Sequence, residues 1–297
     1  MAFVEEILGL QILAKVGEGA RSTIYAVKDR AGQVYALKHV VKQTKDDHRF
    51  IQQALSEHRL AHKLRHPSLR ISHRVHRRRR GLRLRDLYVQ MEFVDGKTLE
   101  QYQPRDLIDL CIVCQKIAEG LSAMHVAGFV HADMKPKNVL VTDDGRVKLI
   151  DFGQSCRAGT VKKRIQGTPD YIAPEQVKLK PITPRTDVYN FGATMYWMLT
   201  GQTVASAMPK DNLPLQKVPA CPAPNELRSD VPTGLSDLVT DCIKNKVENR
   251  PGSMTLVCER LALATSQLQT HPPLFSSPQA DPNSNSDSPS TQLLPST

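Results

Sequence analysis

The most diagnostic segment of the chain is His131-Ala132-Asp133-Met134-Lys135-Pro136-Lys137-Asn138, and Asp151-Phe152-Gly153 follows it thirteen residues after Asn138. The first segment places an acid and an amide five residues apart, and the second adds another acid. Carboxylate and amide oxygens are the ligands that Mg²⁺ prefers, and one further carboxylate can serve as a base. The pattern therefore indicates a site at which a base and magnesium ligands surround one triphosphate.

Composition and charge describe a globular protein with one basic region. The chain has 297 residues, 40% of them apolar and 24% charged, which suits one two-lobed unit or two domains with a substantial core. One arginine-rich stretch supplies most of the formal net charge of +10. Its members are Arg74, Arg77, Arg78, Arg79, Arg80, Arg83 and Arg85.

Nothing in the sequence predicts a membrane anchor, a secretory leader or disulfide bonds. No apolar run approaches the roughly 20 residues that span a bilayer, and no basic leader precedes an apolar core at the N-terminus. The six cysteines show no disulfide framework, and the pair Cys111 and Cys114 lies inside a helical pattern. We expect core thiols in a cytoplasmic protein, and the sequence leaves its oligomeric state open.

The first ninety residues have mainly the pattern of a sheet with one helix. Apolar, β-branched runs bounded by turn residues predict strands at 11–16, 23–28 and 34–40. Two more strand-like runs surround the arginine-rich stretch. A charged helix is expected from about Asp46 to Leu64, because its leading aspartates suit the positive end of a helix.

The pattern becomes helical after Pro104. Apolar residues recur at helical spacing from Leu107 to Met124, which predicts a long, largely buried helix. Two short strands and three further helices are predicted after it, at 139–141, 147–150, 187–199, 235–244 and 254–268. From about residue 269 the chain is rich in Ser and Pro, and so few apolar groups cannot offset the entropy of ordering, so we expect a disordered tail.

In order and spacing, these segments resemble the eukaryotic-type (Hanks-type) serine/threonine protein kinase family, whose bacterial members share this compact form. The resemblance covers roughly residues 10–265, and the Lys135–Asn138 form and Thr168 are more similar to serine/threonine than to tyrosine kinases. It implies an α+β, two-lobed kinase domain that binds ATP and Mg²⁺ between its lobes. The implied boundaries are a small antiparallel-sheet lobe at 10–94, a larger helical lobe at 95–268 and a tail at 269–297.

The resemblance assigns a set of residues to the nucleotide. Gly17 and Gly19 look like a glycine-rich loop, whose backbone can close over phosphates because glycine has no Cβ atom. Lys38 matches the lysine that pairs the α- and β-phosphates, and Glu57 resembles the glutamate that orients it. Met91 would be the gatekeeper beside the hinge. The residues implied to bind ATP are Val16, Gly17, Glu18, Gly19, Ser22, Ile24, Ala36, Lys38, Met91, Glu92, Val94, Leu140, Ile150 and Asp151.

The resemblance also assigns the catalytic groups. Asp133 is similar to the aspartate that accepts the proton of the substrate hydroxyl, and Lys135 would neutralise charge that develops on the transferred phosphate. Asn138 and Asp151 would ligate Mg²⁺. Thr168 would hydrogen-bond Asp133 and Lys135 and so align the substrate platform with the base. The implied reaction transfers the γ-phosphate of ATP to a serine or threonine hydroxyl of a protein.

Two structural contacts are implied in the larger lobe. Glu175, in Ala173-Pro174-Glu175, resembles the glutamate that forms a buried ion pair with an arginine, here Arg250. Asp187 resembles the aspartate at the start of a helix that braces the backbone of the catalytic loop.

Two positions depart from the family's pattern. Ser22 stands where the third glycine of the loop is expected, which would reshape the loop without abolishing binding. Ala132 stands where many members carry an arginine that receives a phosphate on the activation loop. We therefore expect basal activity that does not depend on phosphorylation of Ser155, Thr160 or Thr168.

The run Arg77–Arg80 is expected at a hairpin tip of the small lobe, where a solvated loop is the simplest interpretation. Contact with nucleic acid, acidic lipid or acidic protein is a minor alternative. The run has no interleaved aromatic residues for base stacking, which argues against single-stranded nucleic acid.

Two other functions compete with protein phosphorylation. One is a pseudokinase, a scaffold that binds nucleotide or partners without phosphotransfer, which only the Ser22 substitution favours. The other is a kinase-like enzyme for a small molecule such as an aminoglycoside or choline. Relatives of that kind usually lack the Gly-Thr-Pro and Ala-Pro-Glu segments, which this chain has at Gly167–Pro169 and Ala173–Glu175.

Overall fold

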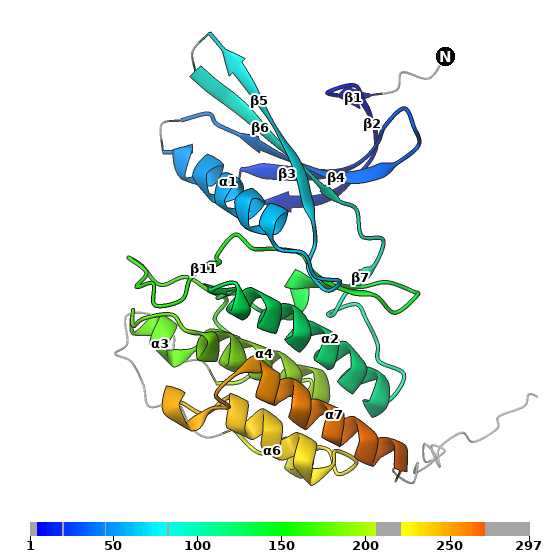
Figure 1. Ribbon diagram of the computed structural model, residues 1–297, viewed down its shortest axis with the longest axis vertical. Coiled ribbons are helices and arrows are strands. Elements are labelled where there is room, and N and C mark those ends of the chain that lie inside the picture. Colours follow the sequence, from blue (N-terminus) through cyan, green and yellow to red (C-terminus); the bar gives the residue numbers. More distant parts are fainter. Residues whose placement is uncertain (1–4, 20, 45, 82, 206–220, 271–297) are drawn as a thin grey trace, which may run out of the picture.

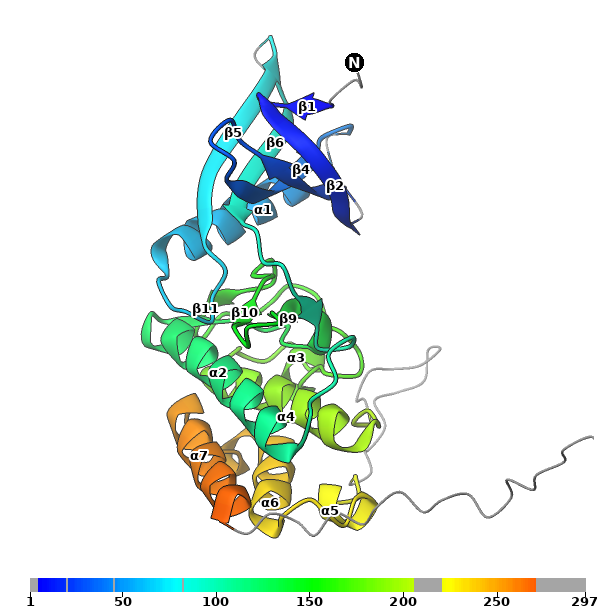
Figure 2. The same cartoon turned by 90° about the vertical axis from the view of Figure 1, so that its right-hand side faces the viewer.

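The computed structural model describes residues 5–19, 21–44, 46–81, 83–205 and 221–270, and it has the expected two-lobed α+β architecture. A sheet with one long helix forms the small lobe, and a bundle of helices forms the large lobe below it (Figure 1). In the view turned by 90°, the segment after β6 runs from the small lobe to the large lobe in an extended form (Figure 2). The tail predicted at 269–297 lies outside the described residues from 271 onward.

The small lobe is a six-stranded antiparallel sheet in the order β1-β2-β3-β4-β6-β5, with α1 packed on one face. The predicted strands and helix are all present, and the arginine-rich stretch lies in the β5–β6 hairpin. The run Arg77–Arg80 was expected as a solvated loop at the hairpin tip, but it forms the end of strand β5 and pairs with β6. Only the two-residue β1 was missed, because it is too short to carry a pattern. The bounds are β1 Glu6–Ile7, β2 Leu10–Gly19, β3 Ser22–Lys28, β4 Val34–Val41, α1 His48–Lys63, β5 Ser72–Arg80 and β6 Arg83–Glu92.

The two faces of this sheet bury different apolar clusters. Side chains alternate along a strand, so Val89 of β6 faces α1 and packs with Ile51, whereas its neighbour Tyr88 faces away. On that opposite face Tyr88 packs with Leu37 and Val27. Because apolar side chains are buried on both faces, the sheet is a rigid support for the residues that it carries toward the large lobe, such as Lys38 on β4.

The large lobe is built around α2, which packs against α7 and α4. Cys111 and Cys114 are buried free thiols on α2, as expected, and burial raises the pKa of Cys111 to about 11. None of the described helices is long and apolar enough to cross a membrane. The four long helices are α2 Leu107–Val126, α4 Pro184–Thr200, α6 Thr233–Cys242 and α7 Met254–Thr270.

Short elements carry the functional loops of this lobe. The strands predicted at 139–141 and 147–150 are present as β9 and β10, whereas the other short elements were not predicted from the sequence. The short elements, predicted or not, are β7 Lys97–Thr98, β8 Phe129–Val130, η1 Pro136–Asn138, β9 Val139–Val141, β10 Val147–Leu149, β11 Cys156–Arg157, α3 Pro174–Val177, α5 Pro224–Leu227 and η2 Val247–Asn249.

The predicted ion pair between Glu175 and Arg250 joins α3 to the segment before α7. Arg250 Nη1 and Nη2 donate to the two carboxylate oxygens of Glu175 at 2.8 and 2.9 Å, and the two side chains are 0% and 4% exposed. Arg250 Nε also donates to the carbonyl of Lys244 at 2.7 Å, and the guanidinium lies 4.8 Å from the ring centre of Tyr189. Because every strong donor has a partner, the buried charge is compensated.

We expect Arg250→Gln to lower the free energy of unfolding in urea by about 3–5 kcal/mol, because it leaves the carboxylate of Glu175 buried without its counter-charge. Arg260→Gln is the matched control. Arg260 pairs with Asp241 at the same 2.8 Å, but the two side chains are 29% and 30% exposed, so the loss should be under about 1 kcal/mol. Equal losses in the two variants would contradict the idea that burial makes the difference.

Candidate active site

Two adjoining cavities lie between the lobes. The larger has a volume of about 660 Å³, within the range of small-molecule sites, and residues from both lobes line it. Its lining includes nine of the predicted nucleotide residues: Val16, Gly17, Glu18, Ile24, Ala36, Glu92, Val94, Leu140 and Ile150. The smaller, of about 200 Å³, is lined by Ser22, Lys38 and Asp151 together with Arg21, Phe50 and Gln53.

Gly19 and Met91 do not line these two cavities. Gly19 ends β2, and a Cβ atom there would meet Ser22 Oγ at 3.0 Å. Met91 pairs with Ala36 across β4 and β6 and is 2% exposed in the small-lobe core. The assignment of these two residues to the nucleotide therefore stays a prediction.

Lys38 and Glu57 form the predicted pair between β4 and α1. Lys38 Nζ lies 2.6 Å from Glu57 Oε2, and the Glu57 side chain is 5% exposed. Burial alone would lower the pKa of Lys38, but the negative charges of Glu57 and Asp151 outweigh it, so that pKa is raised. The ammonium is thus charged, and its contact with Glu57 fixes it in the lining of the smaller cavity.

Arg70 and Lys148 are two buried cations that the sequence did not single out. Arg70 Nη2 lies 3.4 Å from the other carboxylate oxygen of Glu57, and burial lowers the pKa of Arg70. Lys148 Nζ lies 2.8 Å from Glu92 Oε1 at the chain crossing between the lobes. The sequence around Arg70 and Lys148 gives no sign of these ion pairs, because their partners, Glu57 and Glu92, belong to other elements of the chain.

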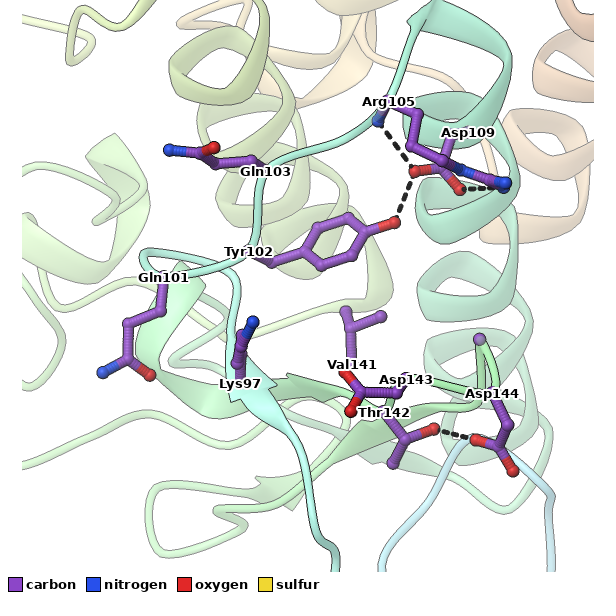
Figure 3. Close-up of a pocket in the computed structure, with 11 residues that line it drawn as sticks. Lys97, Gln101, Tyr102, Gln103, Arg105, Asp109, Val141, Thr142, Asp143 and Asp144 are labelled. Atoms are coloured by element: carbon purple, nitrogen blue, oxygen red, sulfur yellow. Dashed lines mark hydrogen bonds and ion pairs between the residues drawn. The ribbon is translucent and has the colours of Figure 1, made fainter.

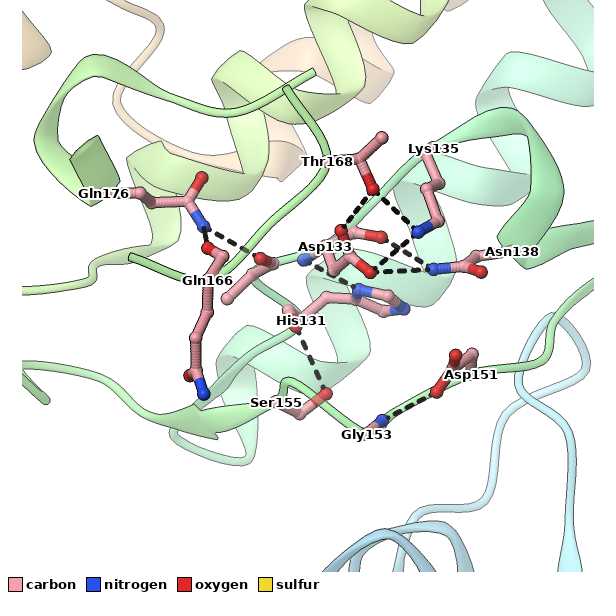
Figure 4. A network of polar contacts seen from close by, with 11 residues as sticks. His131, Asp133, Lys135, Asn138, Asp151, Gly153, Ser155, Gln166, Thr168 and Gln176 are labelled. Atoms are coloured by element: carbon pink, nitrogen blue, oxygen red, sulfur yellow. Dashed lines mark hydrogen bonds and ion pairs between the residues drawn. The ribbon is translucent and has the colours of Figure 1, made fainter. Parts of the chain in front are cut away.

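Asp133, Lys135 and Thr168 form a closed triangle of polar contacts (Figure 4). Lys135 Nζ donates to Asp133 Oδ2 at 3.1 Å and to Thr168 Oγ1 at 2.7 Å, and Thr168 Oγ1 donates to Asp133 Oδ1 at 3.1 Å. These are the contacts expected of Thr168. They fix the carboxylate and place a positive charge beside it.

Asn138 and Asp151 are the two candidate magnesium ligands. Asn138 Nδ2 donates to the backbone carbonyl of Asp133 at 2.8 Å, and the amide oxygen points away from Asp133 (Figure 4). Asp151 is exposed to the cleft and accepts the N–H of Gly153 at 2.8 Å. Loss of water contact would raise the pKa of Asp151, but the charge of Lys38 and the Gly153 N–H outweigh this and lower it. An ionised carboxylate and a free amide oxygen are a donor set that suits Mg²⁺.

The backbone of the catalytic loop is held by Asp187, as expected. Its carboxylate is fully buried and accepts the N–H groups of His131 and Ala132, each at 2.8 Å, while His125 Nε2 lies 2.8 Å away. Ala132 has φ +62°, an unfavourable value for a residue with a side chain. The two hydrogen bonds hold this strained turn, which presents the next residue, Asp133, to the cleft.

A second buried network, centred on Gln176 of α3, was not predicted from the sequence. Gln176 Nε2 donates to the carbonyls of Ala132 at 2.8 Å and Gln166 at 3.3 Å (Figure 4). Asn190 Nδ2 donates to Gln176 Oε1 at 3.0 Å. The carbonyl of Ala132 is therefore bonded by protein, and the segment before Thr168 is tied to the catalytic loop.

Arg21 ties the glycine-rich loop to the start of α1. Its Nε donates to Asp47 Oδ1 at 3.0 Å and its Nη1 to Gln43 Oε1 at 2.9 Å, and the Asp47 side chain is 5% exposed. Asp47 directly precedes α1, so its negative charge lies at the positive end of the helix, as expected, although its carboxylate makes no capping hydrogen bond to the helix. It accepts the N–H groups of Gln43 and Thr44 and the guanidinium of Arg21.

Another cavity of about 660 Å³ lies below the chain crossing, outside the cleft (Figure 3). Asp109 projects from α2 at its edge, where it accepts hydrogen bonds from Tyr102 Oη and from Arg105 Nη2. Thr142 and Asp144 bond one another at the opposite side. None of the catalytic or metal residues predicted from the sequence lines this cavity.

Comparison with known proteins gives one family. The family model described as "Protein kinase domain" matches residues 10–262. A probable serine/threonine-protein kinase of Clostridium acetobutylicum is 34% identical over 59% of this chain and 28% of its own. Serine/threonine-protein kinase PknL of Mycobacterium tuberculosis is 32% identical, over 77% of this chain and 58% of its own length. Serine/threonine-protein kinase PknA of the same species is 29% identical, over 72% of this chain and 51% of its own length. The chain thus spans between about a quarter and three-fifths of the length of these relatives.

We expect Arg21→Ala and Asp47→Asn each to weaken binding of a magnesium–nucleotide analogue by about tenfold in calorimetry, because either change frees the loop that the ligand must then order. The double variant should bind no more weakly than either single variant, since the two residues act through one contact. Arg228→Ala is the control: it breaks an exposed pair with Asp230 in the large lobe, of 40% and 42% side-chain exposure, and should change affinity less than about twofold. Additive losses in the double variant would contradict the tether.

Proposed function

Because the chain belongs to the protein kinase family, we propose that it is an active serine/threonine protein kinase, which transfers the γ-phosphate of ATP to a serine or threonine hydroxyl of a protein. One observation carries the proposal. The Asp133–Lys135–Thr168 triangle contacts Asn138, whose backbone carbonyl accepts the N–H of Ile150. The next residue, Asp151, lines the same cavity as Lys38, which is paired with Glu57, so this chain of contacts joins the candidate base to the candidate nucleotide-holding charge.

The proposed roles follow from the contacts of each side chain. Asp133 accepts the proton of the substrate hydroxyl, and its carboxylate is already oriented by Thr168 and Lys135. Lys135 lies beside it and stabilises the negative charge that grows on the transferred phosphate. Thr168 belongs to the segment that would hold the acceptor peptide, so it aligns peptide and base.

ATP and Mg²⁺ fit the residues that line the cleft. The apolar side chains of Val16, Ala36 and Leu140 suit the faces of a purine, and Lys38 lines the adjoining cavity where phosphates would extend. Asn138 and Asp151 would hold Mg²⁺, which would supply charge that neutralises the phosphates. The protein's own part is to place these groups and to keep Lys38 charged through Glu57.

The competing functions have less support. A pseudokinase scaffold would not need the strained turn at Ala132 or the triangle around Asp133, and retained strain at a loop favours a functional constraint. A small-molecule kinase would not need Thr168 bonded to the base or Gln176 tying the peptide segment to the catalytic loop. Both features support a peptide as acceptor.

We expect Asp133→Asn to lower the rate of phosphate transfer to a mixed protein substrate by about 10²–10⁴-fold, because the amide cannot accept the hydroxyl proton. Nucleotide affinity should stay within about twofold, since the residue acts on the acceptor. The measurement is transfer of radiolabelled phosphate, with nucleotide affinity from calorimetry on the same samples. Asp237→Asn is the matched control, because Asp237 is an exposed aspartate of α6.

The outcomes of that assay separate the three functions. Transfer to protein that disappears in Asp133→Asn supports the proposal. Nucleotide binding without transfer by the wild-type protein would favour the scaffold, and transfer only to aminoglycosides or choline would favour the small-molecule enzyme.

We expect phosphatase treatment of the wild-type protein to leave its activity within about twofold, because protein atoms already hold the activation segment. Gln176 bonds the carbonyl of Ala132, where the family's arginine would otherwise receive a phosphate. Ser155→Ala and Thr160→Ala, whose hydroxyls donate to backbone carbonyls, should behave in the same way. Loss of nearly all activity on dephosphorylation, with recovery after autophosphorylation, would contradict this.

A further inference from the structure

Four exposed cations lie beside the candidate acceptor site. They are Lys163, Arg164, Lys178 and Lys180, and we call them the basic platform. Among the described residues none of the four makes an ion pair or a side-chain hydrogen bond. Elsewhere in the large lobe, Arg228, Lys244 and Arg260 each pair with an aspartate.

The positive charge is local to this surface. Residues 154–185 contain seven lysines and arginines and two acids, of which Glu175 is buried against Arg250. Residues 186–270 contain seven basic and eight acidic residues. The excess therefore does not follow from a generally basic lobe.

Hydrogen bonds gather the two halves of the basic platform next to the catalytic loop. Gln176 Nε2 bonds the carbonyl of Gln166 at 3.3 Å, and Arg164 and Lys178 each lie two residues from that bond. The backbone of Ile182 bonds Gly159 at 2.7 Å and Thr160 at 2.9 Å. The segments around 164 and 178 are thus neighbours, and the same Gln176 nitrogen bonds Ala132, which precedes Asp133.

The basic platform is within reach of a bound peptide. Arg164 precedes Thr168 by four residues, so their Cα atoms are at most about 14 Å apart even in an extended chain. Thr168 bonds Asp133, the residue that would meet the acceptor hydroxyl. An acceptor peptide of similar length on either side of its hydroxyl therefore brings its flanking side chains to Lys163 and Arg164.

We propose that this surface selects protein substrates whose acceptor serine or threonine is flanked by acidic residues. The inference rests on the proposed function. Exposed, unpaired cations attract carboxylates and repel lysine and arginine, and such complementarity suppresses wrong partners as well as attracting right ones. An activation-segment phosphate is the competing occupant, but the arginine that would receive it is replaced by the buried Ala132.

The test uses peptides with a central serine flanked on both sides by glutamates, alanines or lysines. Binding is measured by fluorescence anisotropy on versions with alanine in place of serine, and transfer on the serine versions. We expect the glutamate peptide to exceed the alanine peptide by about tenfold in affinity and in kcat/KM, since each exposed ion pair contributes a factor of roughly 1.4 to 5. The lysine peptide should fall below both, and the preference should shrink as salt rises.

The double variant Lys163→Glu and Arg164→Glu lowers the net charge of the basic platform from +4 to zero, so it should remove most of the advantage of the glutamate peptide over the lysine peptide. Arg30→Glu, in the exposed turn between β3 and β4, is the control for a change of charge and should leave the order unchanged. Phosphate content of each sample is checked by mass spectrometry, so that an occupied activation segment is detected.

The two readouts keep the two proposals distinguishable. Preferential binding of the glutamate peptide without transfer would overturn the proposed function and support the basic platform. Transfer without preference, with preference for the lysine peptide, or with an undiminished preference for the glutamate peptide in the double variant would overturn the basic platform alone. Transfer that requires a phosphorylated activation segment, with no preference among the peptides in dephosphorylated samples, would also overturn it, in favour of the internal phosphate.

Discussion

The buried carboxylate of Asp187 is the constraint on which the candidate site depends. It accepts two backbone N–H groups from a turn that contains Ala132 at φ +62°, a conformation that a residue with a side chain adopts only when its surroundings impose it. That turn places Asp133 at the cleft and His131 against Phe152, at 5.8 Å between ring centres. One carboxylate on α4 therefore fixes both the candidate base and the segment that carries Asp151.

Charge pairs extend this order across the cleft. Lys38 on β4 and Glu57 on α1 meet at 2.6 Å, and Arg70 approaches the same carboxylate from the segment before β5. Asp151 follows β10 of the other lobe, yet its charge raises the pKa of Lys38 and the lysine lowers that of Asp151. The two lobes are thus coupled electrostatically at the place where phosphates would lie, which favours one relative arrangement of their groups.

Local patterns predicted the elements that are long or carry a fixed motif. The strands around Lys38, the buried helix α2 and the segment from His131 to Asn138 all follow from periodicity or spacing, and the pairs Lys38–Glu57 and Glu175–Arg250 follow from the family's motifs. Two-residue strands such as β8 have no periodicity to detect. Contacts such as Gln176 to Ala132 join residues 44 positions apart through a neutral side chain, which no local pattern marks.

The two departures from the family's pattern acquire a physical meaning from those unpredicted contacts. Ser22 stands where the family has the third glycine of the loop. The neighbouring residue, Arg21, forms an ion pair with Asp47, and this pair holds the loop in one position. Where the catalytic loop lacks its arginine, Gln176 bonds the Ala132 carbonyl directly. In both places a hydrogen bond within the protein fixes the chain at or next to the substituted residue. A site assembled in this way is organised before any ligand arrives, so selectivity has to come from the surface that surrounds it.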